Sequence, residues 1–494
     1  MACVTDLVPL LVVAMLALPV GGAIVCTISV RWTDRVSIAT AVLTAAAAIT
    51  VALVVAVDAP HVSRGSWYLV DGAAAVFLAV VALVGLASAL LSPAYLRHAG
   101  RSWFRASRAR AWYYAALQLF WAALLAVPVA ENLAIAWLLV EATTATSALL
   151  VGFSGKPSAL EAGWKYVVLT TLGLAVALLG IVVLYIALGA APSGLARLDW
   201  EQIARGATGV GGDAVIVSFV LICVGLAAKI GWAPVHNWLP DAHSEAPPPV
   251  SALLSAALLP SVLLVAWRLR DALEPTLGAG AVRAVLLAFG LCSLAVAVPF
   301  LWRPLAWKRL LAYSSLEHMG VLALGVAVGG SLATAGVLLH VAGHAVAKAL
   351  GFYAAIPLLR QDPEAAERPA SGVALKSRPT AIAMGVSLTV LGGLPPGPLF
   401  ASELMILLAL IDAGLLPVAV VAALLLALGF LGLAHALLEA LLGTPRSRRA
   451  RPMHSARAVG LATAAASVLL LAMAAVAFEL PDTALVREAA GGLR

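Results

Sequence analysis

Charged residues are scarce in this 494-residue sequence, and that scarcity decides its class. Only 11% of the residues are Asp, Glu, Lys or Arg, whereas 63% are hydrophobic and the mean hydropathy is +1.03. Soluble globular domains typically contain about 25% charged residues. The composition therefore excludes a water-soluble globular chain and predicts an integral membrane protein.

Cysteine is also scarce, and its placement excludes several kinds of site. Cys3, Cys26, Cys223 and Cys292 are scattered through apolar segments without paired spacing. This pattern suggests neither an iron-sulfur cluster nor a structural zinc site. The sequence also lacks a G-x-G-x-x-G loop, so it offers no cofactor motif. We therefore expect no cofactor on this chain and no redox chemistry of its own.

The first ~25 residues lack the basic start that is typical of a signal peptide, and many similar apolar runs follow them. We therefore interpret this stretch as the first membrane span. Since no long soluble domain is evident, residues 1–494 are expected to form one membrane domain. Apolar windows of about 20 residues predict about fourteen spans, near 7–30, 36–58, 72–95, 111–130, 132–153, 164–189, 213–238, 247–270, 278–301, 305–328, 331–358, 378–411, 414–443 and 456–478.

Arginines gather in two of the predicted loops, and this sets the expected orientation. The loop after the third span contains Arg97, Arg101, Arg105, Arg108 and Arg110, and the loop after the thirteenth contains Arg446, Arg448, Arg449, Arg451 and Arg457. Basic loops stay on the cytoplasmic side. An even number of spans then places both termini outside. The net charge of +7 is thus explained by topology, and nucleic-acid binding is not expected.

Prolines predict that two spans are broken. Pro234 and Pro240 fall in the seventh span, and "GGLPPGPLF", with Pro395, Pro396 and Pro398, falls in the twelfth. Each proline removes a backbone donor and clashes with the preceding turn. Broken helices at matching places in two halves of a bundle indicate inverted repeats with a polar site at the breaks.

Ionisable residues within predicted spans are the strongest functional candidates. Each costs at least ~2.5 kcal/mol at the centre of a membrane helix, so its presence indicates function. Three of them, in "LLHVAGHAVAKAL", recur every fourth residue and should share one helical face. The candidates are Glu141, Lys229, His340, His344, Lys348 and Glu403.

Lysine usage supports a proton-carrying role. Six of the 31 basic residues are lysines, so the chain uses arginine where a positive charge suffices. Lys229 and Lys348 are nonetheless lysines. A buried lysine can release its proton, whereas arginine stays charged. A side chain that merely extends toward the membrane interface is the alternative for each lysine.

Four long motifs resemble the antiporter-like, proton-translocating subunits shared by respiratory complex I, Mrp-type antiporters and membrane-bound hydrogenases. They are "KIGWAPVHNWLPDAHSEAPPPVSALL", "KRLLAYSSLEHMGVLALG", "HVAGHAVAKALGFY" and "GGLPPGPLFASE". "SSLEHMG" and "DAHSEAPPPVSALLS" are most similar to component F of hydrogenase-4. The resemblance implies an all-α fold of about 14 transmembrane helices with two inverted five-helix repeats, broken at spans seven and twelve. Expected divisions are 1–110 (flanking spans), 111–270 and 278–443 (repeats) and 456–478 (last span).

The resemblance also implies roles for the candidates. Glu141 would pair with Lys229 as a proton-loading gate, and Glu403 would pass the proton to the far side. His340, His344 and Lys348 would form the central polar axis. His236 and His243 are expected either to line the cytoplasmic entrance or to bond carbonyls freed by the break. Glu317 and His318, in the tenth predicted span, are polar groups of the hydrogenase-4 branch of the family, and the resemblance assigns them no role.

Ser255 departs from the family pattern, because several members carry a titratable residue in the eighth span. A hydroxyl can support a water but cannot hold a proton at neutral pH. The path between Lys229 and the histidine stripe is therefore expected to depend more on internal water.

The expected function is redox-driven proton translocation, powered by electrostatic changes in a partner. The implied partners are other membrane subunits and a peripheral redox module of the nickel-iron hydrogenase or quinone-reducing type, in the bilayer of a bacterial or archaeal cell membrane. Alternatives are a redox-independent cation/proton antiporter subunit and a quinone-binding membrane component. The sequence leaves open the coupling ion (proton or sodium), the redox donor, and the direction and stoichiometry of pumping.

Overall fold

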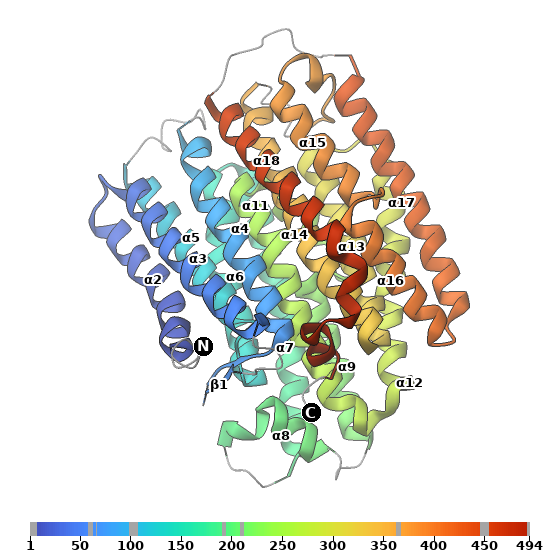
Figure 1. Ribbon diagram of the computed structural model, residues 1–494. Helices are drawn as coiled ribbons and strands as arrows, with labels where there is room; N and C mark the ends of the chain where they lie inside the picture. Colours follow the sequence, from blue (N-terminus) through green and yellow to red (C-terminus); the bar gives the residue numbers. More distant parts are fainter. Residues whose placement is uncertain are drawn as a thin grey trace.

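A computed structural model describes residues 7–57, 63–65, 67–97, 107–189, 194–207, 212–361, 367–444 and 454–491. The protein is a bundle of helices with one two-stranded antiparallel hairpin at its edge (Figure 1). The first half contains α2 (Val8–Ile28), α3 (Thr33–Val57), β1 (Ser63–Arg64), β2 (Leu69–Val70), α4 (Gly72–Leu96), α5 (Ser107–Ala126), α6 (Leu133–Val151), α7 (Pro157–Ala187), α8 (Trp200–Ala207), α9 (Gly212–Ile230) and α10 (Trp238–Glu245).

The second half begins at a proline-rich turn and contains the longest helix. Its elements are α11 (Pro248–Leu253), the π-helical turn η4 (Leu254–Leu258), α12 (Leu259–Leu301), α13 (Trp307–Val328), α14 (Gly330–Gln361), α15 (Arg378–Leu391), α16 (Pro398–Asp412), α17 (Leu416–Leu442), α18 (His454–Val476) and α19 (Ala484–Gly491).

Eleven helices of the described residues are long and apolar enough to cross a membrane. The prediction of an all-α polytopic membrane protein is confirmed. The count of about fourteen spans and the division into inverted repeats stay predictions, because several expected spans are short or broken helices. The stretch 248–301, predicted as two spans, is continuous through α12 except at Gly278, whose φ of +76° interrupts the helical geometry.

The first predicted break is confirmed, with one difference. Helix α9 ends at Ile230, and Gly231 adopts a φ of +82° before α10 starts at Trp238. Pro234 lies in this break, whereas Pro240 lies in the first turn of α10, where no intrahelical N–H is needed. Only one of the two prolines named from the sequence therefore interrupts the helix.

Backbone groups freed by this break are bonded by side chains. The indole N–H of Trp238 donates to the carbonyl of Ala228 at 2.6 Å, and Ser293 Oγ accepts from the Ala233 N–H at 3.0 Å. Unpaired backbone groups are costly in a membrane, so a break persists only where such partners exist. Side chains of the surrounding bundle therefore stabilise this break.

The second predicted break is also present. Helix α15 ends at Leu391, Gly393 adopts a φ of +67°, and Pro398 is the first residue of α16. Proline is favoured at the start of a helix, because its missing N–H is not required there. The twelfth predicted span therefore consists of two short helices, α15 and α16, separated by residues 392–397.

The centre of the bundle is formed by α13 and α14. Their most apolar windows are 100% and 89% buried, whereas those of α17 and α18 are 28% and 17% buried. Large apolar side chains such as Leu424 and Leu461 point outward from the peripheral helices. This arrangement, with polar groups inside and leucines outside, is what a lipid environment favours.

The two ends of the bundle differ. In Figure 1 the end of α4, the start of α5, the end of α17 and the start of α18 lie at the upper end. The start of α2, the hairpin, α8 and α19 lie toward the lower end. The Gly72 N–H at the start of α4 donates to Glu488 of α19 at 2.6 Å, which ties two lower-end elements together. Among the arginines expected in cytoplasmic loops, Arg101, Arg105, Arg446, Arg448, Arg449 and Arg451 lie outside the described residues.

Candidate functional site

Lys229 is fully buried in the last turn of α9, directly before the first break. Its Nζ donates to Thr144 Oγ1 of α6 at 2.7 Å and to the hydroxyl of Tyr166 of α7 at 2.6 Å. Nζ also lies 4.5 Å from the centroid of the Tyr166 ring. The lysine therefore has neutral hydrogen-bond partners and an aromatic face around its amine.

Glu141 and Lys229 are connected through Thr144 and not by a direct contact, and their pairing as a proton-loading gate stays a prediction. No ion pair within 4.0 Å joins them; Thr144, one turn further along α6, lies between. The Thr144 hydroxyl is 3.5 Å from Glu141 Oε2, and Thr171 of α7 donates to Oε1 at 2.8 Å. Glu141 is half-buried and Thr171 is exposed, so the carboxylate sits at the outer side of the α6–α7 pair. The contact between acid and lysine is relayed by a hydroxyl.

Tyr166 extends this hydrogen-bonded group by one residue. Its hydroxyl also bonds Ser147 Oγ at 2.8 Å, so α6, α7 and α9 share one chain of polar contacts. Sequence reasoning missed Thr144 and Tyr166. Threonine and tyrosine are ordinary residues of membrane helices, and nothing in their local spacing distinguishes these two from the others.

The predicted stripe on α14 is present. His340, His344 and Lys348 are all completely buried. Lys348 Nζ donates to the Leu311 carbonyl at 2.7 Å and to Ser314 Oγ at 2.8 Å, both on α13. The stripe therefore faces α13 in the middle of the bundle.

His318 of α13 joins the stripe and turns it into a cluster of three imidazoles. Its Nδ1 is 3.1 Å from His340 Nε2, and its ring centroid is 5.2 Å from that of His344. His340 Nδ1 is 2.9 Å from Ser402 Oγ on α16. Within the described residues, neither ring nitrogen of His344 has a hydrogen-bond partner, and His318 Nε2 has none. We refer to His318, His340 and His344 as the histidine cluster.

Two carboxylates flank this cluster, each placed against a glycine. Glu403 Oε2 lies against Gly393, where a β-carbon would come within 2.6 Å of it. Glu317 Oε1 lies against Gly429 of α17, where a β-carbon would clash with it. Glu317 is buried and its Oε2 has no partner among the described atoms, whereas Glu403 is partly exposed. Both acids thus pack against a glycine, and the positive φ of Gly393 independently favours glycine there.

Ser255 lies in the π-helical turn η4 and is fully buried. Its hydroxyl bonds Ser315 Oγ at 2.8 Å, and Ser315 Oγ donates to the same Leu311 carbonyl that Lys348 bonds. Single π-helical turns are frequent at functional sites. Ser255 is thus connected to Lys348, while no described hydrogen bond connects it to Lys229.

The histidines near the first break do not bond freed carbonyls as one alternative proposed. Both ring nitrogens of His243 lack a hydrogen-bond partner among the described residues, and its ring stacks on that of Phe352 with centroids 5.4 Å apart. Lys308 and Ser251 bond the carbonyls instead: Lys308 Nζ donates to Ala246 at 2.7 Å, and Ser251 Oγ donates to the His243 carbonyl at 2.9 Å. His236 is also buried, with its Nδ1 unbonded.

Lys308 is a buried lysine that sequence reasoning did not select. It lies at the start of α13, is 6% exposed, and donates to a backbone carbonyl rather than to an acid. The scarcity of lysine in this chain was a signal that applied to it as well. It falls at the edge of the predicted tenth span, however, where an interfacial position also explains a lysine.

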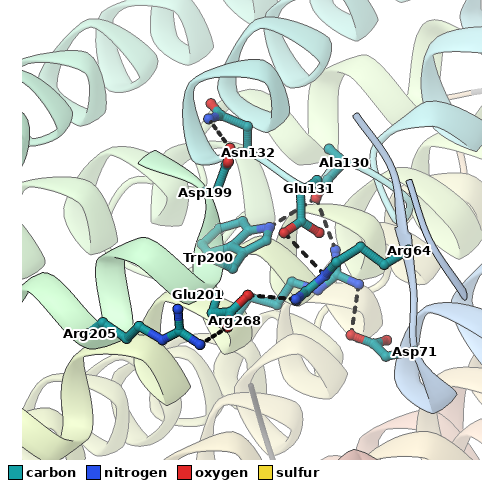
Figure 2. Close-up of polar contacts among 10 residues, drawn as sticks. All are labelled: Arg64, Asp71, Ala130, Glu131, Asn132, Asp199, Trp200, Glu201, Arg205 and Arg268. Carbon is teal, nitrogen blue, oxygen red and sulfur yellow. Dashed lines mark hydrogen bonds and ion pairs between the residues drawn. The ribbon is translucent and has the colours of Figure 1, made fainter. Parts of the chain in front are cut away.

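A separate polar network lies at the lower end of the bundle, near α8 (Figure 2). Arg64 of β1 bonds Glu201 at 2.7 Å and lies 3.5 Å from Glu131. Arg268 bonds Asp71, the N-cap of α4, at 2.9 Å and reaches the carbonyl of Ala130 at 3.3 Å. Further contacts are Asn132 to Asp199, Trp200 to Ala130, and Glu201 to Arg205.

Two acids of this region have raised pKa values. Burial raises the pKa of Glu131 to about 7, against the opposing effect of Arg64. Burial, reinforced by the charge of Asp71, raises the pKa of Glu488 to about 7. The network joins β1, α4, α8, α12 and the segment before α6, so it fixes the lower end of the first half of the bundle. It is separated in sequence and in the fold from the residues around the breaks.

The fold and these buried groups define a polytopic membrane protein of the antiporter-like class. The family model described as "NADH:quinone oxidoreductase/Mrp antiporter, TM" matches residues 130–431, and the chain belongs to this family. The match includes every proton-translocation candidate from Glu141 to Glu403. The protein is therefore an antiporter-like membrane subunit of the kind found in complex I, Mrp and hydrogenase-type complexes.

Individual relatives agree with this assignment. The chain is 33% identical over 350 residues to the "Hydrogenase-4 component F homolog" of Methylacidiphilum infernorum (isolate V4), with 69% of this chain and 72% of that protein covered. A chain of the archaeal membrane-bound sulfane sulfur reductase matches the fold with a TM-score of 0.84 at 20% identity, over 97% of both chains. A chain of the Mrp complex from Dietzia sp. DQ12-45-1b matches with a TM-score of 0.81 at 21% identity, over 99% of this chain and 97% of that one.

Proposed function

We propose that this protein translocates protons across the membrane as a subunit of a respiratory complex I-like or membrane-bound hydrogenase complex of the hydrogenase-4 type. The observation that carries the proposal is the buried, titratable set at the two helix breaks: Lys229 before the first, and the histidine cluster with Glu403 beside the second. Ionisable groups inside the membrane are expensive and mark ion pathways.

The proposed gate is Lys229 together with Glu141, acting through Thr144. Movement of the half-buried Glu141 carboxylate would change the electrostatic support of the ammonium group, which is otherwise surrounded by neutral hydroxyls. Glu141 lies on the outer side of α6, where a neighbouring subunit can alter its surroundings. Loss of that support would favour release of the lysine proton into the bundle.

The proposed second half of the route runs along α14. Lys348, tied to Ser255 through Leu311 and Ser315, would receive the proton. The histidine cluster would carry it toward Glu403, which is partly exposed at the second break. His236, His243 and Glu317 are proposed as lining groups. Internal water would join Lys229 to Ser255, since no side-chain contact does.

The energy source is proposed to be a partner module. A nickel-iron hydrogenase-like or quinone-reducing module with iron-sulfur clusters fits the relatives named for hydrogenase-4 and for NADH-quinone oxidoreductase. The test is to purify the intact complex from its native membranes, identify the other subunits, and measure proton uptake by inverted vesicles when the module's electron donor is added. Proton uptake that follows electron transfer, and that is lost when this chain is deleted, is the expected result.

A redox-independent cation/proton antiporter subunit is the second candidate, favoured by the fold match to the Mrp complex. The same vesicles distinguish it. Exchange of sodium for protons without any electron donor, with only small membrane subunits in the purified complex, would replace the first proposal. A quinone-binding role is less well supported, because the ionisable residues are spread over α6, α9, α13, α14 and α16 and do not line one pocket.

The proposed topology has both termini outside the cytoplasm. A reporter that is active only in the cytoplasm is expected to work when inserted after Arg108 or Arg449 and to be silent near Ser193 or at the C-terminus, because the Arg-rich loops stay inside. Arg449 and Ser193 lie outside the described residues. Reporter activity at the C-terminus would require an odd number of spans and would contradict the two-repeat arrangement.

A further inference from the structure

Three ligand-type side chains from three different helices converge within the bundle. His318 of α13, His340 of α14 and Glu403 of α16 each present a nitrogen or oxygen atom, and these atoms lie within 4.8 Å of one another. Both histidines are fully buried, and Glu403 is partly exposed beside the second break. Two imidazoles and one carboxylate are the donor set of open zinc sites, in which water completes the coordination.

Hydrogen bonds around Ser402 fix the tautomer of His340. The Ser402 hydroxyl donates to the Leu399 carbonyl at 2.8 Å, so its oxygen is left to accept a hydrogen bond from His340 Nδ1 at 2.9 Å. His340 therefore carries its proton on Nδ1 and directs the lone pair of Nε2 toward His318. Metal-bound histidines almost always donate their other ring N–H to such a partner, which fixes the ring orientation.

The spacing of the two imidazoles fits a shared metal ion. His340 Nε2 and His318 Nδ1 are 3.1 Å apart. Two nitrogens bound at zinc-nitrogen lengths in tetrahedral geometry lie roughly 3.3 Å apart. Replacing the proton between them by a metal ion thus requires only a small separation of the rings, with His318 moving its own proton from Nδ1 to Nε2, an atom that has no partner at present.

Two further buried groups lie close to His318. In the part of the chain that the structure describes, both ring nitrogens of His344 lack a hydrogen-bond partner, and its ring centroid is 5.2 Å from that of His318. Glu317, adjacent to His318 in sequence, has an unbonded carboxylate oxygen. The ligand atoms of His344 and Glu317 are not part of the convergent group, so these two residues are neighbours of the site and are not counted among its ligands.

We propose that His318, His340 and Glu403 form a binding site for one divalent transition-metal ion of the zinc class, linking α13, α14 and α16. Imidazole selects zinc, copper and nickel, whereas sodium and magnesium prefer sites made of oxygen atoms. Glu403, the partly exposed member of the set, lies beside Gly393 at the second break. If the proposed function holds, a bound ion occupies the lone pairs that carry protons, so metal binding and proton transfer exclude each other.

The test is cobalt titration of the full-length chain, purified in detergent and stripped of metal with a chelator. Cobalt reports low-coordinate binding by visible absorption, and zinc should displace it. One cobalt per chain is expected. His318→Gln and Glu403→Gln should lose the signal, and Ser402→Ala should weaken binding by about 10- to 100-fold through loss of the orienting bond.

His243→Gln is the matched control, because His243 is a fully buried histidine like those of the cluster but is not part of the convergent group and stacks on Phe352. It should bind cobalt as the unaltered chain does. Gel-filtration profiles show that each variant is folded. No cobalt absorption in the unaltered chain, or equal absorption in properly folded His318→Gln and Glu403→Gln, would overturn the site. The titration does not involve transport, so failure of the proposed proton function would leave its result unchanged.

Discussion

Lys229→Arg is expected to assemble into its complex and to abolish redox-linked proton uptake. Arginine keeps the positive charge but has no accessible neutral form in proteins. The Lys229 amine is fully buried and bonded to two neutral hydroxyls, Thr144 at 2.7 Å and Tyr166 at 2.6 Å, so a change of its protonation state leaves those partners intact. A fall in uptake of about 100-fold or more is expected, the scale of losing a positioned proton-transfer group.

The measurement is proton uptake into inverted vesicles, made alongside the electron-transfer rate of the whole complex. Lys229→Ala supplies the comparison without any charge. Lys165→Arg is the matched control on the neighbouring α7, because Lys165 is 39% exposed and pairs with Glu161 and Asp241, where only charge is needed. That control should pump normally. Normal uptake in Lys229→Arg would remove Lys229 from the proton route and leave it as a structural cation.

Proline and glycine made the broken helices predictable, because their backbone restrictions act locally. Pro234 and the 395–398 run each lie at an interruption. Pro240 does not interrupt a helix, because α10 begins two residues before it and Pro240 therefore lies in the first turn of α10. The residue at which the helix begins again depends on hydrogen-bond partners far along the chain, such as Ser293, which accepts from the Ala233 N–H. A local sequence pattern does not contain such partners.

Rare residues of the candidate site were also predictable, and common ones were not. Lys229, His340 and Lys348 stand out in apolar surroundings because burying an ionisable group is costly. The sequence did not single out Thr144, although its hydroxyl lies between Glu141 and Lys229. The geometry of α6 against α9 decides whether an acid and a lysine touch directly or through a hydroxyl, and this geometry depends on packing across the whole first half of the bundle.

The proximity of His318 to the α14 stripe likewise needed the structure. Spacing by four along α14 shows which residues share a face, but it does not show which residue of α13 that face meets. His318 Nδ1 lies 3.1 Å from His340 Nε2 only because α13 and α14 pack together at this height. A residue without a predicted role thus becomes a central member of the cluster.

Glu403→Gln is expected to leave assembly intact and to reduce proton translocation by about 100-fold. The amide has nearly the same shape, so it still fits against Gly393, where even a β-carbon would come within 2.6 Å of the carboxylate. It cannot bind and release a proton, however, so transfer from the histidine cluster would stop at the second break. The measurement is donor-driven proton uptake by inverted vesicles, with a metal chelator present so that metal binding contributes nothing.

Glu367→Gln, in an exposed segment after α14, is the control for loss of an acid and should pump normally. The electron-transfer rate of the complex separates two kinds of defect. A route that is blocked at Glu403 should slow electron transfer together with uptake if the two are tightly coupled, whereas a misassembled complex should lose subunits on purification. Unchanged uptake in Glu403→Gln would make Glu403 a packing residue at the helix break, and the route would then have to leave the histidine cluster through the other nearby acid, Glu317, whose Oε2 is unbonded.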